Sequence, residues 1–423
     1  MCGIFCSIYQ PQHDSESSKQ WNICKDAIAA RGPDYFMEKH LTLSHDWHGH
    51  FAASVLWMQG PRIMTQPSLD DNDNLLLWNG DLFSGCLAKD DVCDTNIILA
   101  ELQSTTDIMC VLRKIEGPYC LVYYQKSSNT LYFGRDIIGR HSLLLKVDNK
   151  NSAILAAIAH KYVPEDESID LINVAFERLG SKNQSKSHTN NEKENVTQKY
   201  DVPDRKTGRQ TYSELLRIYP NRKWNFIECN ITQMELQLYR ASRICDLLHP
   251  LCTILDESLG CAMWFASRAK GVLYPANEIY ESPCRILLLG IGADELFGGY
   301  MRHRTILKHK GWDALVQELN VELTRISERN LGRDDRIVSD HGKQSRLPYL
   351  DENLVKYVQH IKPWDRCYPT EKMPSGLGDK LLLRLLACKI GFQCTANFPK
   401  RAFQFGSRIA NGKENGNDVS NRL

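Results

Sequence analysis

The sequence has almost no excess charge of either sign. Lys and Arg total 52 and Asp and Glu total 51, which gives a net charge of +1. A protein that holds nucleic acid neutralises phosphates with a basic surface, so this balance argues against a nucleic-acid partner. Long apolar runs are also lacking, since a run such as Ile286–Leu289 is far shorter than the roughly 20 residues that span a bilayer. We therefore expect no nucleic-acid partner and no membrane.

The cysteines lack the spacing of a metal or redox site. All 15 are scattered, with no C-x-x-C pair and no Cys/His cluster at metal-ligand spacing. We therefore assign no metal site from the sequence. The N-terminus has no basic region followed by an apolar stretch, so no secretory signal is expected. Together these features predict a reduced, cytoplasmic protein whose cysteines mostly behave as small core residues.

Two regions of different pattern follow one another along the chain. Residues 2–146 contain short apolar runs bounded by Gly, Asn and Asp, which predicts strands of a buried sheet. Residues 151–410 contain longer helical patterns with occasional apolar strands, which is typical of α/β architecture. Within the second region, residues 180–198 are too polar to bury a core and predict a disordered insertion, and residues 411–423 predict a disordered tail. We therefore expect two domains, at 2–146 and 151–410.

Cys2 is the cysteine that its position sets apart. Removal of Met1 would leave its α-amine free, with a pKa near ~7.7–8, so the amine could take the proton of the thiol. Gly3 beside it allows a substrate carbonyl to approach the backbone closely. Taken alone, Cys2 is better explained as a buried strand residue.

Two other segments of the first region could take part in the same chemistry. Asn79-Gly80 ends a strand, where a side-chain amide and a backbone N–H can point at a developing oxyanion, although Asn-Gly is also the commonest hairpin turn. Asp94 opens an apolar helix and could bind a substrate ammonium, or it could cap that helix. Gly134-Arg135-Asp136-Ile137-Ile138-Gly139 reads as a tight structural turn.

These motifs together resemble a known family. Met1-Cys2-Gly3-Ile4, Arg31-Gly32-Pro33-Asp34, Trp78-Asn79-Gly80-Asp81 and Gly134-Arg135-Asp136-x-x-Gly139 arrive in the order of the class II glutamine amidotransferases. The resemblance implies an αββα sandwich of the N-terminal-nucleophile (Ntn) hydrolase type. It also implies that Cys2 attacks the amide of glutamine and releases ammonia, that Asn79 and Gly80 form the oxyanion hole, and that Asp94 holds the substrate amine. The family arginine that grips the glutamine carboxylate has no counterpart in Ala53–Trp57, and Arg31 or Arg62 is its candidate substitute.

The second region carries a run in which a strand meets glycines and carboxylates. In Leu289-Gly290-Ile291-Gly292-Ala293-Asp294-Glu295, the glycines could approach a pyrophosphate and the carboxylates could hold Mg²⁺. First-turn carboxylates favoured by the helix dipole are the structural alternative. The run and the segment His341–Asp351 resemble glutamine-dependent asparagine synthetase, an ATP-pyrophosphatase-like (adenine nucleotide alpha hydrolase-like) fold. That resemblance implies ATP, Mg²⁺ and aspartate as ligands. It implies a nucleotide and Mg²⁺ site that contains Gly290, Gly292, Asp294, Glu295 and Lys400, with the lysine close to the acyl-phosphate chemistry.

The chain departs from the synthetase pattern in one central place. It contains no Ser-Gly-Gly-x-Asp-Ser loop, and the first strand of the nucleotide-binding sheet has no counterpart between residues 146 and 152. Because backbone N–H groups of that loop cradle the pyrophosphate, we predict that ATP binding is weak or absent. Ile291 and Gln344 also replace family glutamates. Three functions stay open: a glutamine-dependent asparagine synthetase, an enzyme that only hydrolyses glutamine, and a non-catalytic interaction protein.

Overall fold

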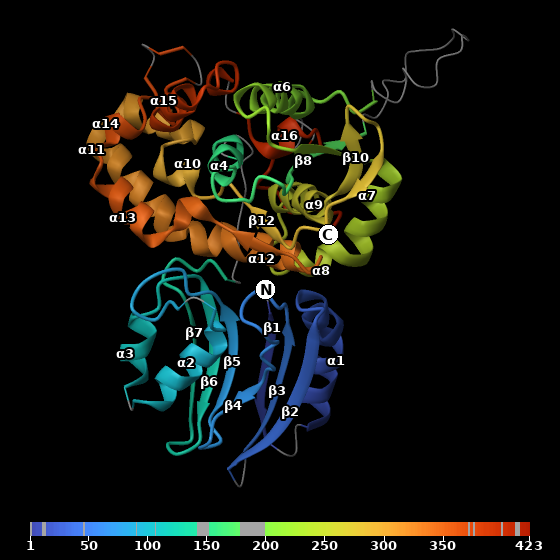
Figure 1. Cartoon of the computed structure of the whole chain (residues 1–423), viewed down its shortest axis with the longest axis vertical. Coiled ribbons are helices and arrows are strands. Elements are labelled where there is room, and N and C mark those ends of the chain that lie inside the picture. Colours follow the sequence, from blue (N-terminus) through green and yellow to red (C-terminus); the bar gives the residue numbers. More distant parts are fainter. Residues whose placement is uncertain are drawn as a thin grey trace. The chain divides into compact units, whose positions relative to one another are not determined.

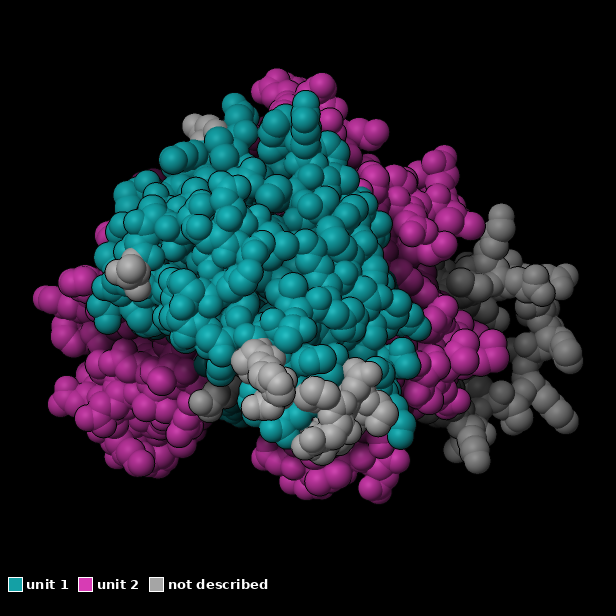
Figure 2. Space-filling view, turned by 90° about the horizontal axis from the view of Figure 1, so that it is seen from below, with its two compact units in different colours: residues 1–145, 326–345 teal, residues 146–325, 346–423 magenta. Residues whose placement is uncertain are grey.

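The computed structural model describes residues 2–10, 14–44, 47–89, 91–105, 107–141, 152–177, 199–370, 373–374, 377–398, 401–410 and 415–423. The chain forms two compact units, shown in different colours in Figure 2. Unit 1 comprises residues 1–145 and 326–345, and unit 2 comprises residues 146–325 and 346–423. Residues 326–345 thus belong with the first unit, whereas the sequence pattern placed them in the second domain. The predicted insertion at 180–198 lies outside the described residues.

Unit 1 is built from two antiparallel sheets and the helices that cover them (Figure 1). The first sheet has the strand order β1-β3-β2 and the second has the order β4-β5-β6-β7. The elements are β1 (Gly3–Tyr9), α1 (Asp14–Arg31), β2 (Tyr35–Ser44), β3 (Trp47–Val55), β4 (Ser68–Leu69), β5 (Leu75–Gly80), α2 (Asp94–Gln103), α3 (Ile108–Arg113), β6 (Tyr119–Gln125), β7 (Thr130–Arg135), a π-helix (Ser327–Leu331), α12 (Gly332–Ser339) and the start of β13 (Gln344–Arg346).

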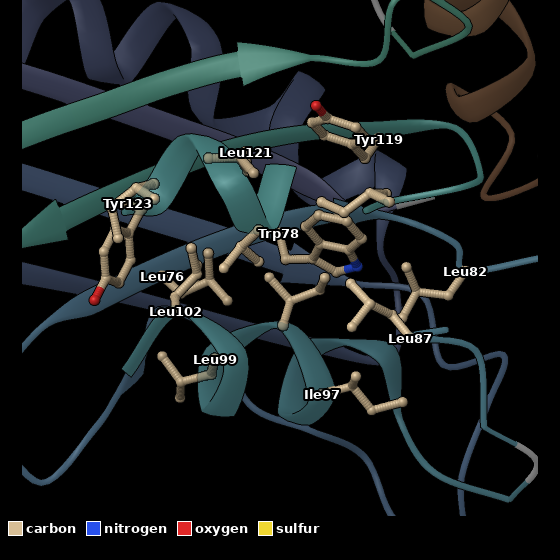
Figure 3. Close-up of a cluster of buried hydrophobic side chains, with 14 residues drawn as sticks. Leu76, Trp78, Leu82, Leu87, Ile97, Leu99, Leu102, Tyr119, Leu121 and Tyr123 are labelled. Carbon is tan, nitrogen blue, oxygen red and sulfur yellow. The ribbon is translucent and has the colours of Figure 1, made fainter. Parts of the chain in front are cut away.

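The alternation of side chains along β5 divides the core of unit 1 into two layers. Leu75 and Leu77 point to one face, where they meet residues of β1, β3 and β6 between the two sheets. Leu76 and Trp78 point to the opposite face, into a cluster formed with α2 and α3 (Figure 3). Because successive residues of a strand alternate between faces, one short apolar run serves both layers. Helix α1 covers the outer face of the first sheet, so the layers follow in the order helix, sheet, sheet, helix.

Unit 2 contains a mixed sheet with the strand order β11-β10-β9-β8, in which only β8 and β9 run parallel. Helices α6 and α9 pack against β8 and β9. The elements are α4 (Ser152–Ala159), β8 (Ile169–Phe176), α6 (Pro203–Ile218), β9 (Trp224–Ile231), α7 (Gln233–Tyr239), a π-helix (Arg240–Ile244), α8 (Cys245–Leu248), α9 (Ile254–Arg268), β10 (Lys270–Tyr274), β11 (Ile279–Glu281), β12 (Ile286–Leu288), α10 (Ala293–Leu296), α11 (Met301–Ile326), a 3₁₀ turn (Pro348–Leu350), α13 (Glu352–His360), α14 (Pro363–Arg366), α15 (Leu381–Ile390), a second 3₁₀ turn (Thr395–Asn397) and α16 (Phe403–Gly406).

The apolar run before Gly290 forms a strand, as predicted, but this strand, β12 (Ile286–Leu288), is only partly buried. β12 lies outside the four-stranded sheet of unit 2, and the side chains of Ile286 and Leu288 are each 41% exposed. Among the described residues, β8 is an edge strand of that sheet and pairs only with β9.

Helices α11 and α15 and the C-terminal segment belong to the packed part of unit 2. Leu315 and Leu319 lie on one face of α11 and are buried with Cys367. Helix α15 ends at Gly391, whose φ of 113° supplies the left-handed conformation expected after a helix. The predicted disordered tail differs from the structure over residues 415–423, because the Ser420 hydroxyl donates to Glu257 of α9 and its backbone N–H donates to the carbonyl of Cys252, just before that helix. Within the described residues, no helix has the length and apolarity needed to cross a membrane.

Candidate functional site

A cleft in unit 1 gathers residues from segments that are far apart in the chain. Cys2, Asn79, Gly80 and Asp94, which the sequence analysis assigned to glutamine hydrolysis, all line it. The remaining polar lining residues are Gln59, Gln66, Asp81, Thr95 and Gln344. The described lining residues include two carboxylates and no basic side chain, so the cleft is acidic.

Cys2 stands directly before β1 and is positioned by the pairing of β1 with β3. Gly3 lies opposite Ser54, and its backbone N–H donates to Ser54 Oγ at 3.0 Å. A Cβ at Gly3 would lie 2.5 Å from the carbonyl oxygen of Ile28, so only glycine fits there. The close approach that Gly3 allows in this structure is therefore one between parts of the chain itself. Burial raises the pKa of the Cys2 thiol, although a hydrogen bond with the backbone of Leu56 acts in the opposite direction.

Asn79 and Gly80 are the last two residues of β5, and they do not form a hairpin turn. They pair with Cys120 and Tyr119 of β6, so the strand continues through both of them. Trp78, buried in the cluster of Figure 3, anchors this end of β5, and its Nε1–H donates to the Gly80 carbonyl at 3.2 Å. Asn79 is 3% exposed. The structure thus holds an amide side chain rigidly against the cleft.

Asp94 is the first residue of α2, but it does not cap that helix. The N-cap residue is Cys93, which makes no side-chain capping bond. The Asp94 carboxylate instead accepts the backbone N–H of Leu82 at 2.8 Å. With its amide nitrogen facing Asp94, Gln59 donates to both carboxylate oxygens, at 2.8 and 3.0 Å. The Asp94 carboxylate therefore faces the cleft, where it accepts hydrogen bonds from the neutral amide of Gln59.

Arg31 does not lie among the residues that line the cleft. It ends α1, and its guanidinium pairs with Asp335 at 2.9 Å. The turn that follows has a different role, because Asp34 accepts the backbone N–H of Trp57 at 2.8 Å and so fixes the wall of the cleft. The turn at 134–139 is confirmed as structural: the buried Asp136 carboxylate accepts the backbone N–H of Arg140 at 3.0 Å.

A buried polar network behind the cleft was not found by sequence reasoning. Gln344 Nε2 donates to Asp81 Oδ2 at 2.6 Å, and the two residues are 263 positions apart. His141 lies between two carboxylates, with its ring nitrogens 3.9 Å from Asp81 Oδ2 and 3.7 Å from Asp335 Oδ1. Burial opposes protonation of His141, but these carboxylates outweigh it and raise the pKa of the imidazole. Gln344 had drawn notice only as a departure from a family glutamate, and nothing local marks His141.

In unit 2, the residues predicted to bind nucleotide and Mg²⁺ are engaged with one another. Gly292 has a φ of 89° and precedes the short helix α10. Asp294 Oδ1 lies 2.9 Å from Lys380 Nζ, and Tyr300 donates to Glu295 at 2.5 Å. Burial and the charge of Asp294 raise the pKa of Glu295 to about 7. A Cβ at Gly299 would collide with the Asp294–Lys380 pair, so the backbone at Gly299 packs directly against that pair.

Gly290 follows β12, while the remaining predicted residue of this group, Lys400, lies outside the described residues. The junction at 146–151, where the nucleotide-binding loop was sought, also lies outside them. Asp294 and Glu295 as they stand do not fit Mg²⁺, because one already faces an ammonium and the other is held near its neutral form by burial.

Comparison with known proteins matches residues 228–315 and 307–408 to the asparagine synthase family. The human asparagine synthetase domain-containing protein 1 is 29% identical, covering 97% of this chain and 95% of that protein. The Drosophila melanogaster asparagine synthetase domain-containing protein CG17486 is 30% identical, covering the whole of both. Asparagine synthetase B of Escherichia coli is 28% identical over 25% of this chain and 19% of its own length.

The length of these alignments bears on the missing loop. The human relative aligns over 618 positions, whereas this chain has 423 residues, so at least 195 aligned positions (618 less 423) have no residue here. The relatives therefore carry internal segments that this chain lacks.

Proposed function

The chain belongs to the family of asparagine synthetase domain-containing proteins, and from this premise we propose that unit 1 hydrolyses the side-chain amide of glutamine. Cys2 is the nucleophile. The observation that carries the proposal is that one cleft contains Cys2, Asn79, Gly80 and Asp94, which come from three separate segments of the chain. The order of its layers supports placing unit 1 among the Ntn hydrolases.

The reaction begins with a thiol that needs a base. Burial raises the pKa of Cys2, so the thiol is protonated at neutral pH. Once Met1 is removed, the α-amine of Cys2 takes that proton and the sulfur attacks the amide carbon. The amine then returns the proton to the leaving nitrogen, which departs as ammonia and leaves a thioester. Water hydrolyses the thioester, which releases glutamate and restores the thiol.

Asn79 and Gly80 stabilise the oxyanion that forms when sulfur attacks. An amide N–H that is fixed before the reaction costs no reorganisation when charge develops, and it acts more strongly away from water. Asn79 meets both conditions, since it is buried and belongs to a paired strand. Gly80 keeps the backbone open, because a Cβ there would lie 2.6 Å from the Trp78 ring.

Asp94 and Asp81 bind the ammonium group of the substrate. Each now accepts hydrogen bonds from a neutral amide, Gln59 in one case and Gln344 in the other. An ammonium makes charge-assisted hydrogen bonds, which are about twice as strong as those from an amide. The substrate therefore displaces Gln59 from Asp94 when it binds.

The test is glutamate release from glutamine by the whole chain and by Cys2→Ala. Loss of the nucleophile should lower the rate by at least about a thousandfold. Cys86→Ala, which removes an exposed thiol outside the cleft, is the matched control and should keep full activity. Mass spectrometry of the purified chain should find Met1 absent, and a glutamine-mimicking electrophile should label Cys2 alone. Equal glutamate release by wild type and Cys2→Ala would leave only the interaction-protein function.

Asparagine synthesis from aspartate, ATP and the released ammonia is the second candidate, favoured by the family match over unit 2. We rank it below hydrolysis alone, because Asp294 and Glu295 are already engaged and the pyrophosphate loop is absent. Unit 2 is then a scaffold of the ATP-pyrophosphatase type. Isothermal titration with Mg·ATP should give no micromolar binding, and such binding would restore the synthetase function. With fifteen free cysteines, we place this activity in the cytoplasm.

A further inference from the structure

We propose that the face of the sheet β1-β3-β2 that packs on α1 holds a divalent cation of the zinc class, ligated by Glu38, His40 and His50. One ligand atom from each residue lies within 4.8 Å of the other two. Among the described residues, this is the one group of three or more His, Cys, Asp or Glu side chains with that property. It is separate from the Cys2 cleft, none of whose lining residues it shares.

The register of two strands creates the cluster. His40 of β2 lies directly opposite His50 of β3, and Glu38 is two residues from His40. Residues two apart on a strand project to the same face, so all three side chains emerge together. The sheet holds their backbones in place, so the ligands are set in position by pairing that does not depend on the metal.

Aromatic neighbours orient the buried ligand. His50 is 3% exposed, and its ring packs edge-on against Trp21 of α1 and Phe5 of β1, with centroids 5.0 and 5.4 Å away. His40 stacks on it at 4.0 Å and is exposed. The buried imidazole thus has a fixed direction, while the exposed one can turn toward an ion that arrives from solvent.

The hydrogen bond between Glu38 and His50 marks where the cation belongs. Glu38 Oε2 and His50 Nε2 are 3.0 Å apart. Ligand atoms around a tetrahedral zinc, with bonds of ~2.0–2.1 Å, are about 3.3 Å apart, so this pair needs little movement. A cation bound there would take the place of the hydrogen between the two atoms. That hydrogen would then move to Nδ1 of His50, so that the ring stays neutral. Lys25 donates to the other oxygen, Oε1, at 3.3 Å and leaves Oε2 for the metal.

The chemistry of the three ligands selects the metal. Two imidazoles and one carboxylate suit zinc and similar borderline cations, whereas Mg²⁺ and Ca²⁺ prefer oxygen ligands alone. Water from solvent would fill the fourth position of such a site. The site would fasten the edge strand β2 to β3, the strand that also positions Cys2 through Ser54.

Cobalt titration of the whole chain tests the proposal, because fifteen cysteines could bind metal elsewhere. Cobalt held by thiolates absorbs intensely in the near ultraviolet, whereas a His/His/Glu site shows only weak visible bands. We expect one cobalt ion with weak visible bands, displaced by zinc. His40→Ala and Glu38→Gln should each weaken binding by more than about tenfold. His48→Ala, on the same strand and face as His50 but outside the cluster, should bind as wild type.

Three results would overturn the proposal: no binding by wild type, thiolate bands only, or unchanged affinity in His40→Ala. His40 is exposed, so its alanine variant should fold, and circular dichroism checks this. The readout does not involve Cys2. A failure here therefore leaves the proposed glutamine hydrolysis untouched, and the reverse holds as well.

Discussion

Unit 1 and unit 2 each bury a pair of carboxylates near a strand end, but they give them different partners. Asp81 and Asp94 of unit 1 each accept a hydrogen bond from a neutral amide at the cleft, and Asp81 also lies 3.9 Å from the buried His141 ring. In unit 2, Asp294 faces the ammonium of Lys380 and Glu295 accepts the hydroxyl of Tyr300. A carboxylate whose charge is already neutralised has little left to offer a cation. The comparison shows that the same residue types at a strand end can have different partners, and that the partners decide what the carboxylates can bind.

The sheets of the two units differ in the same sense. Unit 1 completes its layers, with β5 sharing residues between two cores. Within the described residues, the sheet of unit 2 ends at β8, and β12 lies half-exposed outside it. Ligand sites of open α/β sheets form between neighbouring strand ends, and the described residues contain no strand that joins β12 to this sheet.

Breaking the Lys380–Asp294 pair should produce the largest effect. Lys380→Met leaves the buried Asp294 without its cation, which should lower the free energy of unfolding of unit 2 by about 3–5 kcal/mol. Urea unfolding measures this, and adding Asp294→Asn should recover part of the loss. Glutamine hydrolysis in unit 1 should persist at urea concentrations where unit 2 stays folded. An almost unchanged free energy of unfolding in Lys380→Met would contradict this, because it would mean that Asp294 does not depend on the Lys380 ammonium.

Asn79→Ala sharpens the comparison from the side of unit 1. Loss of one oxyanion donor should lower kcat for glutamine hydrolysis by about 10²–10³. KM should change little, because the donor acts on the transition state. Steady-state kinetics measure both constants, and labelling of Cys2 by the glutamine-mimicking electrophile checks that the cleft is intact. A rise in KM alone would assign Asn79 to substrate binding instead.

The pH dependence of unit 2 tests the state of Glu295. Its pKa is about 7 in the folded chain, against an ordinary value of 4.5. The folded state therefore binds the proton more tightly than the unfolded state, so stability from this group is present at low pH and falls as pH rises through 4.5 to 7. The loss should amount to roughly 3 kcal/mol. In Glu295→Gln, the urea midpoint should change less with pH across this range. An unchanged dependence of the midpoint on pH would contradict the raised pKa of Glu295.

Gln59→Ala should give the smallest effect, and in the favourable direction. Its amide occupies Asp94 in the empty cleft. Removing an internal competitor worth about 1 kcal/mol should lower the KM for glutamine about fivefold, with kcat unchanged. Asp94→Asn should do the reverse and raise KM. A higher KM in Gln59→Ala would mean that Gln59 helps to hold the substrate.

Local pattern was enough for much of the fold. The strand at Leu75–Trp78 and the helix ending near Arg31 follow from short-range rules of alternation and turn residues. The same rules predict the strand before Gly290 but not its exposure, because an apolar run does not say which strands lie beside it. They also left Asn79-Gly80 as a possible hairpin, since pairing with β6 depends on residues 40 positions away.

The amino-acid order alone determined the family, the motifs and the candidate nucleophile, since each is a matter of residue type at a given spacing. Only the folded chain decided which charges are free to act. Gln344 reaches Asp81 across 263 positions, Arg31 turns to Asp335, and His50 meets Glu38 across a strand pair. Electrostatic effects fall with distance in space and depend on burial. Neither quantity can be read from separation along the sequence.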